Sequence, residues 1–101
     1  MADVIKPTFL LGKPAATVGV DYLMKRDAGF RKFVYDSFAR YANRDWGDIC
    51  DEDKQLNEQA LKIGERVMGV YIRKNSGGRS KIYIITEADR SVTTVLFPEE
   101  Y

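Results

Sequence analysis

The apolar residues of this 101-residue chain change their spacing at Glu65, and that change limits the fold more than any other feature. Before Glu65 they recur at the period of amphipathic helices. After it come three stretches rich in Val, Ile, Tyr and Thr: RVMGVYIRK, SKIYIIT and VTTVLF. The connections between them, NSGGR and EADRS, have the composition of hairpin turns. The sequence therefore predicts an antiparallel β-meander over residues 65–97.

Neither face of this predicted sheet is polar. Ile82 and Ile84 point to one face, whereas Tyr83 and Ile85 point to the other. An antiparallel sheet with one solvated face alternates apolar and polar residues more cleanly than this. We therefore expect both faces to be covered, one by helices and the other by the N-terminal segment or by a second subunit. The second alternative predicts a homodimer through the sheet.

Helices are predicted before the meander. Thr17 is a suitable N-cap for a short helix that ends near residues 27–29. The strongest helix spans residues 29–45, and we expect it to pack an aromatic face on the sheet. The apolar stripe of that helix consists of Phe30, Phe33, Val34, Phe38 and Tyr41.

The N-terminal part of the chain is expected to add little regular structure. Residues 1–7 are predicted to be a loose leader that ends at Pro7. Gly12 and Pro14 interrupt the apolar residues that follow, which is typical of a short edge strand with a bend. The whole chain is then a single α+β domain. It has a small antiparallel sheet of three to four strands and two or three helices packed mainly on one face.

Composition excludes several classes of site and favours a soluble, cytoplasmic protein. The sequence contains no histidine, which removes His-dependent triads, common zinc sites and the usual general base. Its one cysteine, Cys50, permits no intramolecular disulfide and suits a reducing compartment. No segment has the length of a membrane span or the core of a signal peptide. Sixteen basic and fifteen acidic residues leave a net charge of +1, which argues against a dedicated nucleic-acid or membrane surface.

The segment DWGDICDEDKQLNEQAL, residues 45–61, holds six carboxylates. Three of them, from Asp51 onward, immediately precede a helical pattern that stops at Gly64. Free N–H groups and the helix dipole favour carboxylates in a first turn by roughly 0.3–1 kcal/mol each. We expect Asp51 to be the N-cap, with Asp48 as the alternative. The predicted apolar face of this helix consists of Leu56, Ala60 and Ile63.

The alternative for the same segment is a divalent-metal site at Asp45, Asp48 and Asp51. The segment lacks the glycine and glutamate that complete a calcium-binding loop, and no second motif suggests a two-metal site. Cys50 has no base beside it that would activate a nucleophile. We therefore expect no catalytic residue, no metal and no cofactor.

The predicted hairpin around Gly77 and Gly78 is basic. Its glycines join two strands, so they do not match a phosphate-binding loop, which opens a helix. A flexible hairpin tip explains them, and a protruding β-ribbon also fits a nucleic-acid groove. The candidate nucleic-acid contacts are Arg73, Lys74, Arg79 and Lys81. Four cations of the aromatic helix extend this set: Arg31, Lys32, Arg40 and Arg44.

The single tryptophan, Trp46, is expected in the loop between two helices. A core tryptophan is the commoner case, yet a loop tryptophan among acidic residues also has the composition of an interaction hot spot. Asp89 and Arg90, at the tip of the last hairpin, either stabilise the turn through an Asx motif or a salt bridge or join the same surface. The candidate interaction surface comprises Asp45, Trp46, Asp48, Glu87, Asp89 and Arg90.

Two segments, RYANRDWGDICDEDKQLNEQAL and KIYIITEADRSVTTVLFPEEY, resemble a family of small bacterial proteins found on plasmids, phages and integrated elements. Members are labelled plasmid-related or restriction-associated, and the resemblance runs from about Phe9 to Tyr101. It transfers no catalytic residue to this chain. It implies an accessory protein of mobile DNA, a class that often binds and blocks host machinery.

The residues and the resemblance together predict a non-catalytic protein-interaction module of a mobile element, which modulates host defence through an unidentified protein partner. The alternative is a nucleic-acid-binding accessory protein that uses the basic hairpin. A third class, a metal-dependent hydrolase, requires the carboxylates of residues 45–61 to converge on one ion.

Overall fold

The computed structural model describes residues 6–74 and 81–101. Within them the helices are α1 (Val18–Arg26), α2 (Ala28–Ala42) and α3 (Asp51–Ile63). The strands are β1 (Lys13–Ala16), β2 (Val67–Ile72), β3 (Lys81–Thr86) and β4 (Val92–Leu96), and a short 3₁₀ helix, η1 (Pro98–Glu100), follows β4. The fold is α+β, as the change of hydrophobic spacing predicts. Of the predicted leader, the two described residues, Lys6 and Pro7, are exposed coil.

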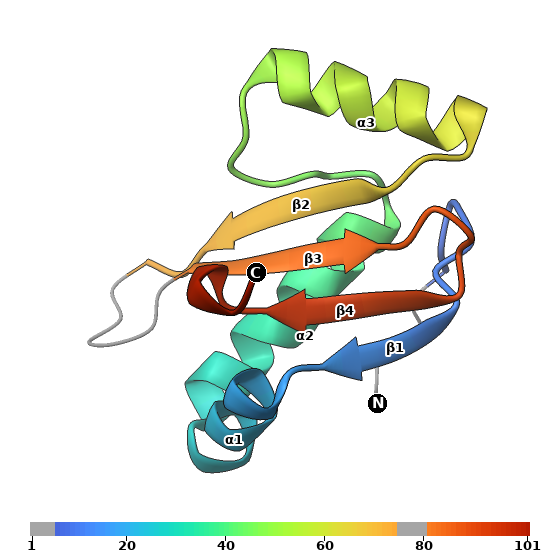
Figure 1. Ribbon diagram of the computed structural model, residues 1–101. Helices are drawn as coiled ribbons and strands as arrows, with labels where there is room; N and C mark the ends of the chain where they lie inside the picture. Colours follow the sequence, from blue (N-terminus) through green and yellow to red (C-terminus); the bar gives the residue numbers. More distant parts are fainter. Residues whose placement is uncertain (1–5, 75–80) are drawn as a thin grey trace.

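The sheet has the strand order β1-β4-β3-β2 and is mixed (Figure 1). β2, β3 and β4 form the predicted antiparallel meander, with Val67 opposite Thr86. β1 lies at the edge as expected, but it runs parallel to β4, with Lys13 opposite Val92. The prediction of a purely antiparallel sheet is therefore wrong. The direction of β1 follows from Thr17, which ends the strand and caps α1, so the strand must run toward the end of the sheet where α1 packs.

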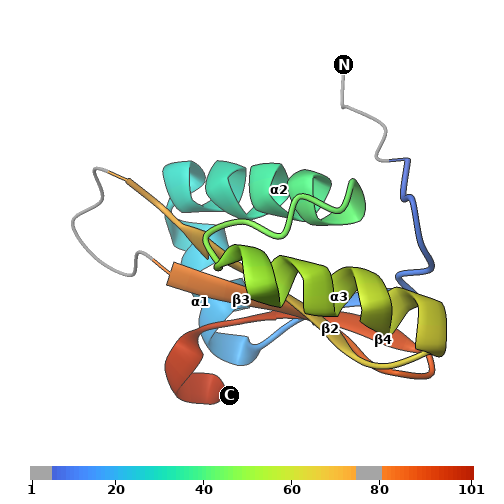
Figure 2. The ribbon, with the colours of Figure 1, turned by 90° about the horizontal axis from the view of Figure 1, so that it is seen from above.

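The helices lie at two different places around the sheet. α2 crosses one face and α1 packs against α2 near the β1 edge, whereas α3 lies beyond the β2 edge (Figures 1 and 2). The aromatic stripe of α2 faces the sheet as predicted. Phe30, Val34 and Tyr41 are buried, and Phe33 and Phe38 are partly buried against the same core.

α3 begins and ends where the sequence predicts. Three carboxylates occupy its first turn, and Gly64 closes it with a left-handed φ of 75°. The N-cap position, however, is Cys50 and not Asp51. The side chain of Cys50 makes no capping hydrogen bond, so the three carboxylates act on this helix end as first-turn charges.

The predicted apolar face of α3 is wrong at Leu56 and Ile63, and is confirmed at Ala60. Leu56 and Ile63 are each 61% exposed, and the buried residues are Asn57 and Ala60. Asn57 turns inward because its amide donates to Met68 O at 2.8 Å and accepts from Met68 N at 3.2 Å. These two bonds satisfy backbone groups at the open edge of β2, and they outweigh the preference for burying leucine.

The face of the sheet opposite α2 carries no described helix except η1 at one end (Figure 1). The described part of the N-terminal segment does not cover this face, as one alternative predicted, because Phe9 packs against Tyr41 and Trp46 on the helical side. The centre of the face is nevertheless shielded by neighbouring side chains. Its buried central residues are Val70, Ile85 and Leu96.

A chain of buried hydroxyl groups crosses the main core. Tyr41 Oη lies 2.7 Å from Thr86 Oγ1, which lies 2.7 Å from Thr93 Oγ1, and Thr93 donates to Leu11 O at 2.6 Å. A carbonyl can only accept, so the proton of Thr93 is committed to Leu11. Thr86 must then donate to Thr93, and Tyr41 must donate to Thr86. The Leu11 carbonyl thus fixes the donor-to-acceptor direction of all three hydrogen bonds.

Replacing Thr86 with valine should interrupt this series of hydrogen bonds at its centre. The substitution removes Tyr41's main acceptor and leaves the phenol with a longer contact of 3.3 Å to Val67 O. We expect the free energy of unfolding in urea to fall by about 1–3 kcal/mol. The matched control is Thr94→Val on the other face of β4, which should cost less than about 0.5 kcal/mol. Equal losses in the two variants would contradict a structural role for the hydroxyl chain.

Candidate functional site

Trp46 is a core residue and not the exposed aromatic anchor of the predicted interaction surface. Its side chain is 2% exposed, and its ring centroid lies 5.3 Å from that of Tyr41 and 5.6 Å from that of Phe9. The indole N–H donates to Glu58 Oε2 at 2.9 Å. Its hydrogen-bonding capacity is therefore used within the chain.

The charged residues of that predicted surface divide between the two ends of β2. Asp48 Oδ2 accepts from Ile72 N at 3.0 Å, at the last residue of the strand. Glu87 directly follows Thr86, which pairs with Val67 at the first residue of the strand. Six strand residues span about 17 Å. The six predicted residues therefore do not form one surface.

Asp48 and its neighbours protect the outer edge of β2. Val70 N donates to Trp46 O at 3.1 Å, and Asp48 N donates to Val70 O at 2.6 Å. Gly47 bridges to Val70 with a φ of 81°, and a Cβ there would collide with Val70 O. Segment 46–48 thus takes the place of a neighbouring strand, which leaves β2 without a free edge along this stretch.

Asp45 anchors the same segment to α2. Arg40 Nε and Nη2 donate to the Asp45 carboxylate at 2.8 and 3.2 Å, and Gly47 N donates to it at 3.1 Å. The hydrogen bond from Arg40, helped by the one from Gly47, lowers the pKa of Asp45 below its ordinary value of 3.8. Among the described residues, no three acidic or cysteine side chains are grouped as metal ligands would be. Asp45, Asp48 and Asp51 instead serve three separate structural purposes.

Glu87, Asp89 and Arg90 shape the turn between β3 and β4. Ser91 N donates to Asp89 Oδ1 at 3.0 Å, which is the Asx motif that the sequence suggests. Arg90 adopts a left-handed φ of 60°, and its guanidinium reaches Glu87 O at 3.2 Å and Ala60 O at 3.4 Å. These contacts fasten the turn to α3.

The three described candidate nucleic-acid residues, Arg73, Lys74 and Lys81, lie at the other end of the sheet. Arg79 lies outside the described residues. Lys81 begins β3 opposite Ile72, the residue that precedes Arg73 and Lys74.

The structure brings two of the four additional helix cations to the same place: Lys32 and Arg40 line one cleft together with Arg73 and Lys74. The other two are engaged elsewhere, since Arg31 donates to Met24 O at 2.8 Å and Arg44 lies 3.6 Å from Glu58.

Sequence reasoning missed a different feature, the outer side of α1. Val18 and Tyr22 are 87% and 56% exposed, and Tyr35 of α2, also exposed, lines a groove together with Asp21 and Met24 of α1. The signal available in the sequence was the composition of α1. This nine-residue helix has several apolar side chains, but Val20 is its one buried residue.

Two apolar grooves flank α1. One of about 370 Å³ lies between β1, α1 and α2, with Val34 and Val95 among its lining residues. The other, of about 390 Å³, is lined by Val18, Gly19, Tyr22, Leu23 and Phe97. We call Val18, Tyr22, Tyr35 and the two grooves the α1 surface.

Comparison with models of known families, with curated proteins and with solved structures finds no match to this chain. None of the described helices is long and apolar enough to cross a membrane. The α1 surface and the charged cleft are thus the observations from which a function can be proposed.

Replacing Asp45 with asparagine should change how stability depends on pH. Because the pKa of Asp45 is lowered in the folded chain, the stabilisation is complete above the ordinary value of 3.8 and is lost as the pH falls through that value toward the lower folded pKa. Urea denaturation of wild type and Asp45→Asn at about pH 7 and about pH 3 measures this. We expect the advantage of the wild type to shrink at the lower pH. An unchanged difference would show that the ion pair does not stabilise the fold.

Proposed function

We propose that this chain is a non-catalytic protein-binding module and that its partner docks on the α1 surface. The observation that carries the proposal is the grouping of exposed apolar side chains with two apolar grooves around one helix. Contiguous apolar patches on a protein surface often mark sites of protein interaction. Tyrosine, which supplies Tyr22 and Tyr35 here, is among the residues enriched at such interfaces.

α1 is held firmly enough to act as a binding platform. Thr17 Oγ1 accepts from Val20 N at 3.4 Å and donates to Glu100 Oε1 at 2.7 Å, which joins the start of the helix to η1. At its other end, Asp27 N donates to Leu23 O at 2.9 Å. A preformed surface loses little conformational entropy on binding, so more of the contact energy appears as affinity.

Polar groups border the apolar centre of this surface. Lys25 and Asp21 form an ion pair of 2.9 Å, and the Arg26 guanidinium lies 3.7 Å from the ring centroid of Tyr22. An apolar centre with a charged rim is the usual anatomy of a reversible protein interface.

The sheet supports docking less well than its sequence suggests. Among the described strand residues, Ile72 is the one large apolar side chain that is exposed. Self-association through the sheet would bury little additional apolar area for this reason. The proposal therefore places the partner on α1 and does not depend on a homodimer.

The resemblance to accessory proteins of mobile DNA supplies the biological part of the proposal. A protein that blocks host defence by occupying a surface needs a rigid apolar patch and no catalytic group. The α1 surface meets that requirement. The partner that fits it best is a protein with a complementary apolar ridge or an amphipathic helix that enters a groove.

The test is a pull-down from bacterial lysate with the tagged chain, after nuclease treatment. The variant Val18→Asp/Tyr22→Asp places charge on the α1 surface, and we expect it to lose a partner that the wild type retains. The matched control is Leu56→Asp/Ile63→Asp, which charges equally exposed apolar residues on α3, and it should retain the partner. Circular dichroism confirms that both variants are folded.

Two results would overturn the proposal. If both double variants bind alike, the α1 surface is not the docking site. If recovery disappears on nuclease treatment, the chain contacts nucleic acid and the alternative function gains support.

A further inference from the structure

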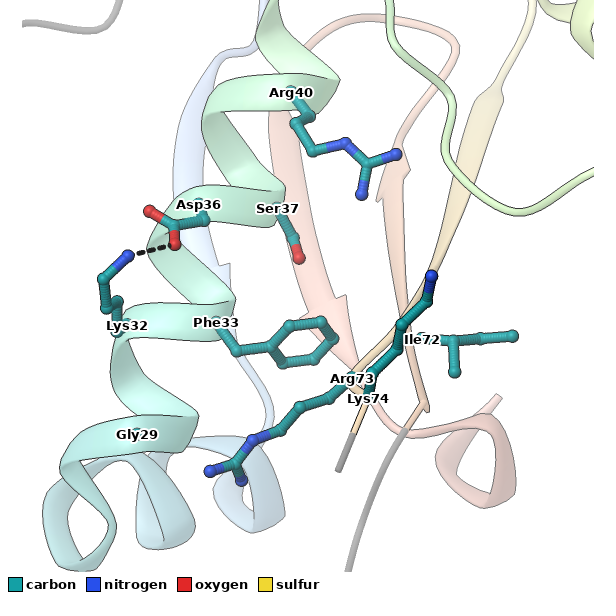
Figure 3. Close-up of a pocket in the computed structure, with 9 residues that line it drawn as sticks. All are labelled: Gly29, Lys32, Phe33, Asp36, Ser37, Arg40, Ile72, Arg73 and Lys74. Atoms are coloured by element: carbon teal, nitrogen blue, oxygen red, sulfur yellow. Dashed lines mark hydrogen bonds and ion pairs between the residues drawn. The ribbon is translucent and has the colours of Figure 1, made fainter. Parts of the chain in front are cut away.

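We propose that the charged cleft beside α2 binds a phosphate monoester of a small molecule. The cleft has a volume of about 300 Å³ and opens between α2 and the end of β2 (Figure 3). Four cationic side chains line it, and three of them are ion-paired: Lys32 with Asp36, Arg40 with Asp45 and Arg73 with Asp27. None of the four lines a groove of the α1 surface.

A buried hydroxyl group to which no described residue offers a hydrogen-bond partner lines this cleft. Ser37 is 2% exposed, and its side chain extends from α2 toward β2 (Figure 3). Among the described residues, no group forms a hydrogen bond with it. Buried hydroxyl groups in native proteins are nearly always hydrogen-bonded. A bound oxygen acceptor supplies the partner that the described residues do not.

The cations around Ser37 retain donors for such a ligand. Arg73 donates to Asp27 through Nη1 alone at 3.2 Å, although a guanidinium has five N–H donors. Lys74 forms no ion pair with any described residue. Arginine recognises phosphate with its planar fork and lysine as a point charge.

A phosphate monoester fits this arrangement better than a carboxylate does. A phosphate monoester has three terminal oxygens that accept hydrogen bonds, whereas a carboxylate has two, so the phosphate can use more of the donors that line the cleft. The ring of Phe33 adds an apolar wall beside the charged groups (Figure 3). That wall suits the ring of an esterified group such as a nucleoside.

Gly29 leaves the space in which the Arg73 guanidinium lies. A Cβ added at Gly29 would be 2.6 Å from Nη2 of Arg73, so the variant Gly29→Ala must displace that group. The substitution keeps every charge of the cleft and favours the helix. The variant therefore tests the geometry of the site without changing its net charge.

The experiment is isothermal titration calorimetry of the intact chain with inorganic phosphate, a nucleoside 5′-monophosphate, the matching nucleoside and a single-stranded oligonucleotide. We expect the monophosphate to bind and the nucleoside to bind at least tenfold more weakly. Ser37→Ala, Gly29→Ala and Lys74→Gln should each weaken monophosphate binding about tenfold or more. The control Lys62→Gln, an exposed cation on α3, should leave the affinity unchanged.

Stability measurements separate a binding role of Ser37 from a structural one. Ser37→Ala removes a buried hydroxyl that has no hydrogen-bond partner among the described residues, so without ligand its Tm should equal or exceed that of the wild type. A lower Tm would show that the hydroxyl has a partner in the chain, and the proposal would fall. It would also fall if neither phosphate nor monophosphate binds, if Ser37→Ala binds as the wild type does, or if only the oligonucleotide binds.

Discussion

The hydroxyl chain from Tyr41 to Leu11 is the interaction on which the arrangement of the elements depends. It joins α2, β3, β4 and the segment before β1 inside the core. Burial raises the pKa of Tyr41, so the phenol keeps the proton that it donates to Thr86. Leu11 is thereby held beside β4, and β1 follows it directly. Thr17, at the end of β1, then fixes where α1 begins. The position of the α1 surface therefore depends on the hydrogen bond that Thr93 donates to Leu11 O.

α2 is the element that both candidate surfaces share. One side of it borders the apolar groove through Val34 and Phe38, and another borders the charged cleft through Phe33 and Ser37. Its buried residues between these sides pack on the sheet. One helix therefore separates an apolar region from a cationic one.

Local patterns predict those parts of the molecule that local physics determines. The stripe from Phe30 to Tyr41 and the strands of the meander have clear periods, and both are confirmed. The direction of β1 has no such signal, since it depends on where α1 packs. On α3, hydropathy favours burial of Leu56 and cannot show that the Asn57 amide completes the hydrogen bonds of a distant strand edge.

The charged cleft is likewise formed by residues that lie far apart in the sequence. Lys32 and Arg40 are visibly basic in the sequence, and so are Arg73 and Lys74, but the two pairs are separated by more than thirty positions. Their meeting depends on how α2 crosses the sheet. Ser37 gives no signal at all, because a serine on a helix is ordinary until its burial and its lack of a described partner are known. Trp46, in contrast, follows the commoner case of a core tryptophan.

The parallel pairing of β1 with β4 also determines when the sheet can be completed during synthesis. β1 emerges from the ribosome early, yet its partner residues, Val92–Val95, emerge about eighty residues later. Until then β1 has no strand beside it, and α1 has no sheet on which to bury Val20. Contacts between such distant residues form slowly because a long loop must close first. The first helix of the chain is thus among the last to reach its place, and a nascent chain that lacks β4 cannot present the α1 surface to a partner.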